Sequence, residues 1–529
     1  MKSEEIRRDD YSVVETKDKE EMQKKEAEDS DALENVLYHA GGMGLYQKLL
    51  FLSMLPVGYF FVFIYFGQMF ITATPQQHWC HVPELAHLDL KTRRNLSVPR
   101  VGDGWAQCAV YAANWSHVLH DMQPPVPATP TVPCKHGWDF LLGDIPYHTV
   151  VSERGWVCEY AGYAPLAQTI YFVGALVGGI LFGWMADRFG RVPVLVVLEY
   201  VEPKYRTLLV SMSTALFFGT GALLLPWIAY FIADWRKFLW ITSLPLALMA
   251  FAPFVVPESA RWLASRGKVN RAVKVLRTLE KVNGTKIPQQ VMDDFIVSAT
   301  QTKETNESLI DLFKIGPLRN MIIYMVVIYM ACAMMFDGLV RMSEGLGLDF
   351  FVTFTLASVT EIPSVTIVAI VLDRWGRRNL TIVPTVLAGA LTIIAGFLPK
   401  GVPQVALAIA SRFMINMSYT AIVQWSAELV PTGARASGSA LIHVSGYIAT
   451  MMSPFIVYSE RVWSPLPLLI LGGTALVASS FALLLPETMG RPMPQTMDEG
   501  ERFVRSHTVC GKAEDKDDFK YEKSDALFT

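Results

Sequence analysis

The sequence predicts an all-α membrane protein of about ten transmembrane helices, arranged as two related helical bundles. The first observation is the composition, because 52% of the 529 residues are hydrophobic and only 18% are charged, against about 25% charged in soluble domains. The second is that the apolar residues fall in blocks of roughly 20, the length of helix that crosses a ~30 Å hydrocarbon core. The third is an internal repeat, in which three short motifs of the first half return in the same order in the second half.

Each apolar block is one predicted span, and the charges between the blocks predict the orientation. Cytoplasmic loops carry an excess of Lys and Arg, and the segment 257–319 is rich in both. We therefore expect a plasma-membrane, multi-pass protein with both termini in the cytoplasm. The predicted spans are 46–72, 163–186, 208–232, 237–256, 320–341, 350–371, 380–398, 403–425, 437–459 and 465–485.

The same charges give the predicted domain plan. A cytoplasmic tail (1–44) precedes an N-terminal bundle (45–256) with a large extracellular loop (73–162), and a central cytoplasmic loop (257–319), a C-terminal bundle (320–485) and a cytoplasmic tail (486–529) follow.

The loop 73–162 has the features of an oxidising compartment. It contains four of the six cysteines, which predicts two disulfides with three possible pairings. It also contains Asn-x-Ser sequons at Asn95 and Asn114, and we expect glycosylation of at least one of them. Three further sequons, at Asn283, Asn306 and Asn416, fall in the predicted cytoplasm or membrane. The expected disulfide cysteines are Cys80, Cys108, Cys134 and Cys158.

The internal repeat predicts that two helices are missing from the first half. "GWMADRFGR" at 183–191 pairs with "IVLDRWGRR" at 370–378, "EYVEPKYRT" at 199–207 with "ELVPTGARA" at 428–436, and "PESARWL" at 257–263 with "PETMGRP" at 486–492. The second and third pairs are each 229 residues apart, but the aspartates of the first pair are only 186 apart. The shortfall of 43 residues is about two membrane crossings.

The gap therefore lies near 191–192 and removes the third helix and most of the fourth. The segment 192–200 would be the residual end of that fourth helix. Because an even number of crossings is lost, the orientation of everything downstream is unchanged. A first half that is naturally shorter is the alternative to a deletion such as an alternative-splice product.

The order and spacing of these motifs resemble the major facilitator superfamily, and more closely its organic cation/carnitine/organic anion transporter family. "LENVLYHAGGMGLYQ", "GWVCEY", "PESARWL" and "LPETMGRPMPQTMDEGE" carry the resemblance, together with the long cysteine-bearing loop. Sugar transporters share the DRxGRR and PES/PET signatures but lack the large loop, so they are the second choice. Family members usually have twelve helices and often six cysteines in the loop, and this chain departs from both patterns.

The repeated motifs suit a gate at the cytoplasmic helix ends. A carboxylate there can accept bonds from a facing helix N-terminus and pair with an Arg, and a Gly allows a tight reversal of the chain. The resemblance implies that such residues hold the cytoplasmic side closed, and the alternative is that they only fix the topology. The expected gate residues are Asp187, Arg188, Gly190, Arg191, Glu199, Arg206, Asp373, Arg374, Gly376, Arg377, Glu428 and Arg435.

Substrate selection is expected from polar groups inside the membrane, where ionisable side chains are costly. Glu361 is the clearest, and the resembled family has a matching acidic residue before a Pro. A structural pairing with Arg412 is the alternative. The resemblance places the charge-selecting position of the eleventh family helix at Tyr447, which leaves Glu361 and aromatic rings to hold a cation. The expected substrate-binding residues are Glu361, Tyr447, Tyr171 and Trp425.

The sequence thus predicts a transporter of small organic cations, or of zwitterions such as carnitine-like amines, that works by alternating access. One alternative is a non-transporting truncated or splice-type product that associates with a full-length relative, and another is a sugar-like transporter of the same superfamily. The expected partners are the small organic ion and the lipid bilayer, and the net charge of −3 gives no sign of nucleic acid binding. We expect no enzyme activity, no cofactor and no metal, and the Gly pairs at 178–179 and 472–473 fit close helix packing.

Overall fold

The computed structural model describes residues 32–506, apart from 54, 103, 190–199, 201–208, 210–211, 249–257, 302–308, 432–433, 492 and 495. The chain divides into two compact units. Unit 1 comprises Met1–Thr305 and Asp349–Ala369, and unit 2 comprises Asn306–Leu348 and Ile370–Thr529. Each unit is described by itself.

A helix lies within each of the ten predicted spans wherever the structure describes them, but 249–256 of the fourth span lie outside the described residues. In the described residues, seven stretches are long and apolar enough to cross a membrane, namely Leu45–Ile71, Ala215–Ile232, Gly316–Glu344, Phe350–Trp375, Arg377–Gly396, Val402–Leu429 and Ser437–Arg461. The three other predicted spans coincide with α7 (Tyr163–Phe189), α11 (Trp235–Leu248) and α23 (Leu466–Ala482). The predicted all-α membrane architecture is confirmed.

The apolar helices of unit 1 carry two irregular turns. These apolar helices are α2 (Leu45–Ser53), α3 (Leu55–Ile71), α7, α10 (Thr220–Ile232), α11 and α18 (Phe350–Val359). A π-helical turn, Thr214–Gly219, leads into α10. The predicted sixth span is divided after Val359, and α19 (Glu361–Trp375) follows. The division has a local cause, because Pro363 has no N–H to donate to the carbonyl of Val359 and its ring crowds that carbonyl.

Unit 2 is a tightly packed helical bundle. It contains α16 (Leu309–Lys314), α17 (Gly316–Arg341), α20 (Arg377–Gly396), α21 (Val402–Leu429), α22 (Arg435–Tyr458), α23 and α24 (Met497–Arg505). Buried apolar side chains of α17, α21 and α23, such as Met325, Ile422 and Leu471, form one continuous core. A Cβ on Gly472 of α23 would lie 2.7 Å from the carbonyl oxygen of Gly389 on α20. Only glycine permits this approach of two helix backbones.

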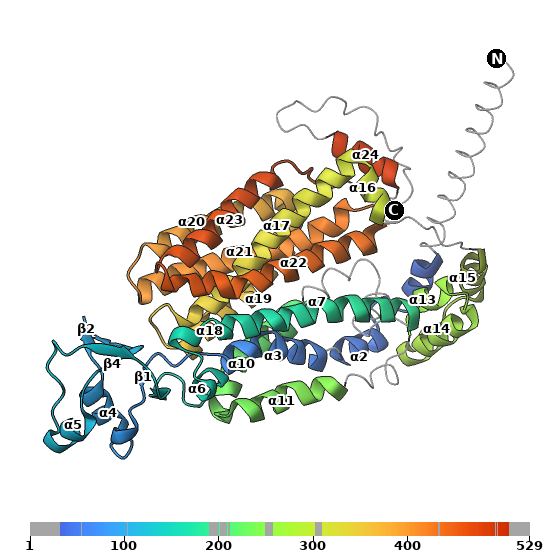
Figure 1. Ribbon diagram of the computed structural model, residues 1–529. Helices are drawn as coiled ribbons and strands as arrows, with labels where there is room; N and C mark the ends of the chain where they lie inside the picture. The colour runs from blue at the N-terminus through green and yellow to red at the C-terminus, as the bar shows by residue number, and fades with distance from the viewer. Residues whose placement is uncertain are drawn as a thin grey trace, which may run out of the picture. The chain divides into compact units, whose positions relative to one another are not determined.

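Residues 73–162 form a small separate element of unit 1, which we call the disulfide domain (Figure 1). Its disulfides join Cys80 to Cys134 and Cys108 to Cys158, one of the three pairings that the sequence allows. The strands pair antiparallel as β1 (His78–Cys80) with β6 (Trp138–Phe140), β2 (Arg100–Val101) with β3 (Gly104–Trp105), and β4 (Ala109–Tyr111) with β5 (Thr131–Pro133). Short helices complete it: α4 (Leu90–Ser97), α5 (Trp115–Asp121) and α6 (Val150–Arg154).

A second small helical element joins the start of the chain to the predicted central loop. The helical residues 32–39 pack on α13 (Ala260–Ser265), α14 (Val269–Asn283) and α15 (Gln289–Gln301) around buried Leu37, Leu263 and Leu276. The side chain of Asn283 accepts from the Tyr46 N–H at 2.8 Å and donates to the Ala40 carbonyl at 2.7 Å. The sequon at Asn283 is therefore occupied by structural hydrogen bonds.

Candidate functional site

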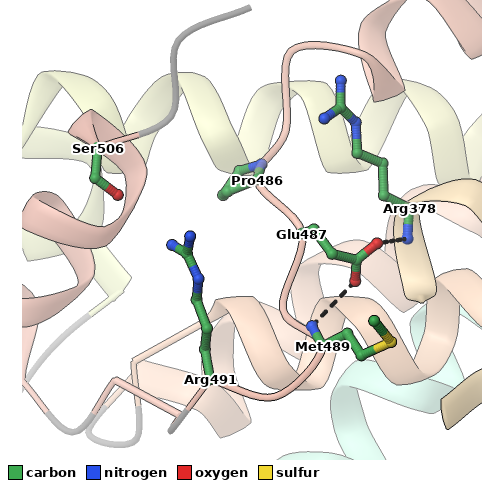
Figure 2. A pocket seen from close by; sticks show the side chains of 6 residues that line it. All are labelled: Arg378, Pro486, Glu487, Met489, Arg491 and Ser506. Carbon is green, nitrogen blue, oxygen red and sulfur yellow. Dashed lines mark hydrogen bonds between the residues drawn. The ribbon is translucent and has the colours of Figure 1, made fainter. Parts of the chain in front are cut away.

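A carboxylate that sequence reasoning did not select organises one end of the bundle in unit 2. Glu487 Oε1 accepts from the N–H groups of Arg377 (2.9 Å), Thr488 (2.9 Å) and Met489 (3.1 Å), and its Oε2 accepts from the N–H of Arg378 (3.0 Å). Figure 2 shows the carboxylate between Arg378 and Met489. Arg377 is the first residue of α20, so Glu487 occupies the positive end of that helix.

Gly376 is required for this arrangement. Its φ is +82°, a conformation that disfavours residues with a Cβ. A Cβ at this position would also lie 2.5 Å from Glu487 Oε2. The predicted tight reversal at Gly376 is therefore also the place where the carboxylate approaches the backbone.

A second carboxylate links the three repeated motifs of the second half. Arg377 Nε lies 3.0 Å from the carboxylate of Glu428, and Thr488 Oγ1 donates to Glu428 Oε2 at 2.6 Å. Arg377 also pairs with Asp373 at 2.9 Å, one turn earlier in the chain. We call Gly376, Arg377, Glu428 and Glu487 the latch.

Most of the predicted gate residues of the second half lie in or beside the latch. Arg435 Nε donates to the carbonyl of Val430 at 3.3 Å. Burial lowers the pKa of the Arg435 guanidinium, and the charge of Glu428 partly opposes that shift. Arg374 is exposed. The sequence signal for Glu487 is its PET motif at 486–488, which repeats the PES motif at 257–259.

The gate residues expected in the first half cannot be compared in the same way. Gly190, Arg191, Glu199 and Arg206 lie outside the described residues, and for Asp187 and Arg188 the structure describes the α7 backbone but not the side chains. Next to them along the chain, Tyr200 is described. Its hydroxyl donates to the carbonyl of Glu258 at 2.6 Å, and its own carbonyl accepts from buried Gln47 at 3.2 Å. In the first half, therefore, the PES motif contacts the EYVEPKYRT motif through Glu258 and Tyr200.

A pocket of about 220 Å³ adjoins the latch. Arg491 reaches into it in Figure 2, on the same side as Ser506. Its lining residues are Arg378, Pro486, Glu487, Met489, Arg491 and Ser506.

Glu361 occupies the irregular middle of the predicted sixth span. It is 2% exposed and is the first residue of α19, where the helix dipole favours a negative charge. Two buried hydroxyl-bearing residues, Ser358 and Ser364, lie within one turn of it. The structure thus places a buried carboxylate at a proline-induced helix division inside an apolar segment, which is the usual setting of a functional ionisable group in a membrane protein.

An aromatic cluster lies in unit 1, on the helices that flank the division at Glu361. The ring centroid of Phe354 on α18 lies 5.5 Å from that of Phe66 and 5.0 Å from that of Phe70, both on α3. Phe218, in the π-helical turn, contacts Phe66 at 5.9 Å. Aromatic rings and a carboxylate are the two groups that attract ammonium ions, and unit 1 contains both.

The other predicted substrate residues have different surroundings. Tyr171 and Tyr447 are half-buried. Trp425 is fully buried, and its indole N–H donates to the carbonyl of Pro486 at 3.2 Å. The structure places Trp425 in the core of unit 2, next to the latch.

Unit 2 contains two polar groups that the sequence left unassigned. Tyr329 bonds to the hydroxyl of Tyr419 at 2.7 Å and to His443 Nδ1 at 2.8 Å, so His443 is hydrogen-bonded, as a structural histidine would be. Asp337 and Arg341 form a buried ion pair, with Arg341 Nε 2.5 Å from Asp337 Oδ2. Within the described residues, no cluster of His, Cys, Asp or Glu side chains has the arrangement of a metal site.

Comparison with known proteins decides the family. A family model described as "Sugar (and other) transporter" matches residues 195–497, more than half of the chain. The chain belongs to that family. It is a member of the major facilitator superfamily and, within it, of the organic cation transporter family, as the motifs predicted. It is thus a multi-pass membrane protein of a transporter family and not an enzyme.

The sequences of three relatives align with most of this chain. The carcinine transporter of Drosophila melanogaster is 29% identical over 567 aligned positions, covering 94% of this chain and 83% of the relative. The beta-alanine transporter of the same organism is 28% identical and covers 90% of each chain. Solute carrier family 22 member 3 of Rattus norvegicus is 26% identical over 543 positions, covering 90% of this chain and 97% of the relative. Since the rat alignment is longer than the part of this 529-residue chain that it covers, several tens of its positions have no residue here.

Proposed function

We propose that this protein transports small organic cations or zwitterions across the plasma membrane by alternating access, and that Glu361 binds their ammonium group. One observation carries the proposal, namely the buried carboxylate at the division between α18 and α19. A buried carboxylate attracts a cation strongly, because water does not screen its charge.

The relatives support the same substrate class. Two of them are named for carcinine and beta-alanine, which are small amines. The aromatic cluster of unit 1 favours a cation further, whereas a sugar needs several hydrogen-bonding side chains.

We propose that the latch closes the cytoplasmic side of the second half. Its hydrogen bonds run between α20, the end of α21 and the segment after α23, so all of them must break if these helix ends separate. The disulfide domain would then lie outside the cell, with Asn95 and Asn114 as glycosylation sites. Both side chains are exposed.

The test is Glu361→Gln, which removes the charge and nearly keeps the shape. Uptake of labelled tetraethylammonium and of labelled beta-alanine is measured in expressing cells, with surface protein quantified by biotinylation. For beta-alanine, whose ammonium group can donate to the carboxylate, we expect the Michaelis constant to rise by the equivalent of ~1–3 kcal/mol, the range for hydrogen bonds to charged groups. For tetraethylammonium, which has no N–H, the Michaelis constant should also rise, because the attraction between the two charges is lost. The matched control is Glu84→Gln in the disulfide domain, an exposed site that should leave uptake unchanged.

Two results would contradict the proposal. Uptake by the parent chain that stays at the vector level, despite confirmed surface expression, would exclude transport. An unchanged Michaelis constant in Glu361→Gln would give Glu361 a structural role.

A second candidate function rests on the 43-residue shortfall. A first half without two helices suits a non-transporting product that associates with a full-length relative, and the unmatched positions in the rat alignment support the shortfall. Co-expression with a full-length relative should then lower that relative's surface level or uptake. Normal transport by this chain, with no effect on the relative, would rule this candidate out.

A further inference from the structure

Three glycines bring helices close together beside Glu361. A Cβ on Gly58 of α3 would lie 2.6 Å from Cβ of Phe217. A Cβ on Gly219 would lie 3.0 Å from Cγ1 of Ile362 and 3.4 Å from Cβ of Glu361. On Gly221 it would lie 3.5 Å from both Tyr59 and Val62. We call Gly58, Gly219 and Gly221 the glycine joint.

The joint places the start of α10 in contact with α3 on one side and α19 on the other. Gly219 and Gly221 are two residues apart, which turns their Cα positions about 200° around a helix axis, so one faces α19 and the other faces α3. Between them, Thr220 Oγ1 and the Tyr59 hydroxyl are 2.7 Å apart. This hydrogen bond fixes the rotation of α10 relative to α3.

The π-helical turn Thr214–Gly219 ends at the joint. A π-turn inserts an extra residue into a helix and occurs frequently at functional sites. Here the widened turn carries Phe217 to Gly58, Phe218 to Phe66, and Gly219 to the first turn of α19. Two irregular helix segments, 214–219 and 359–361, therefore pack directly against each other at the buried carboxylate.

We propose that Gly219 is a positioning residue for Glu361, and that its missing side chain sets where the carboxylate meets the ammonium group of the substrate. This inference rests on the proposed function, because it assigns a role in the same cation site. The argument is steric. The side chains of Ile362 and Glu361 pack on the bare backbone of Gly219, so a side chain there must push Ile362 aside next to Glu361.

Gly219→Ala tests the inference. Its methyl group would lie 3.0 Å from Cγ1 of Ile362, closer than ordinary van der Waals contact, so the Ile362 side chain must shift by a few tenths of an ångström beside Glu361. We expect the Kd and the Michaelis constant for tetraethylammonium to rise about tenfold, the change that 1.4 kcal/mol gives. The maximal uptake rate per surface transporter should change less than twofold. A general folding defect would instead lower the surface level and the maximal rate.

Two further variants separate positioning from general damage. Ile362→Ala removes the atom that the new methyl group meets, so Gly219→Ala with Ile362→Ala should recover most of the parental affinity. Gly174→Ala is the control, because it makes the same change in α7, where the new methyl group would meet nothing within 4 Å of the described structure, and it should leave the Michaelis constant within twofold of the parental value.

A double-mutant cycle with Glu361→Gln shows whether Gly219 acts through the carboxylate. If it does, Gly219→Ala has little further effect once Glu361→Gln is present. If the two substitutions act independently, so that their fold-changes in the Michaelis constant multiply, the inference is overturned. It is also overturned if Gly219→Ala leaves affinity unchanged.

Purified protein distinguishes this failure from failure of the transport proposal. Tetraethylammonium binding is measured by the shift of the thermal unfolding midpoint in detergent, alongside uptake. Binding that depends on Glu361 and Gly219 without uptake would contradict transport and support the joint. Binding and uptake that ignore Gly219 would overturn the joint alone, and no binding by the parent protein would overturn both.

Discussion

The first and second halves of this transporter use the same motifs but pack their helices differently. In the second half, Gly472 of α23 touches Gly389 of α20 so closely that a Cβ on either would lie within 3 Å of the other's carbonyl oxygen. In the first half, a Cβ on Gly174 or Gly179 of α7 would meet nothing within 4 Å in the described structure. None of residues 173–179 is buried, whereas α20 alternates buried and exposed residues along its length.

This difference teaches that a packing motif has structural meaning only when its partner is present. The Gly pair at 472–473 was predicted to pack closely, and the structure confirms this for Gly472. The equivalent prediction for 178–179 has no neighbour at Gly179. The third and fourth helices, which the repeat predicts to be missing, would supply such neighbours.

The largest effect should come from restoring the missing helices. Inserting the third and fourth helices of a full-length relative between Arg191 and Val192 should cover the exposed face of α7. We expect the thermal unfolding midpoint to rise by several degrees, since 1 kcal/mol shifts a large domain by about 2–4 °C. Uptake should rise with it. An insertion that changes neither would mean that the first half is naturally short.

A matched pair of glycine substitutions tests directly whether α23 and α7 differ in packing. Gly472→Ala forces a methyl group to within 2.7 Å of the Gly389 backbone, so we expect a loss of about 3 kcal/mol in unfolding free energy, the upper end for overpacking. Gly179→Ala enters open space and should change stability by less than about 0.5 kcal/mol. Equal effects in purified protein would show that α7 is packed as tightly as α23.

The latch gives a smaller expected effect. Glu487→Gln replaces an acceptor of four N–H groups by an amide, and we expect a loss of about 2 kcal/mol. Hydrogen exchange at the start of α20 should report it as faster exchange. Glu501→Gln is the control, because Glu501 pairs with Arg505 near the surface and such pairs contribute ~0–1 kcal/mol. Unchanged exchange in Glu487→Gln would show that the latch does not hold α20.

The smallest effect should come from the ion pair that ties the disulfide domain to the first half. Arg236 lies 2.6 Å from Glu153 on α6 and lowers the pKa of that carboxyl group. A lowered pKa means that the pair stabilises the protein above the ordinary Glu value of about 4.3, and that this contribution is lost as the pH falls through the lowered folded value. Limited proteolysis of the disulfide domain should accelerate only below about pH 4.3. Glu153→Gln should remove that pH dependence, and the same acid response in this variant would assign it to another group.

The sequence by itself determined the membrane class, the all-α fold and the family, and the ten spans and the repeat with its missing helices stay predictions. Each depends on local features, since an apolar run must become a helix in a bilayer to satisfy its own backbone, and the motifs can be read from neighbouring letters. It also identified Glu361, because an acid inside an apolar segment is conspicuous.

Only the tertiary structure decided which distant groups meet. Four cysteines allow three pairings, and the fold brings Cys80 to Cys134 and Cys108 to Cys158. Arg377 joins Glu428 from 51 residues away, and Glu487 caps α20 from 110 residues away. Gly219 reads as an ordinary membrane-helix glycine until Ile362 and Glu361 are seen against it. The physical reason is the same in each case, because contacts between residues far apart in the chain depend on helix packing geometry that no local pattern of residues specifies.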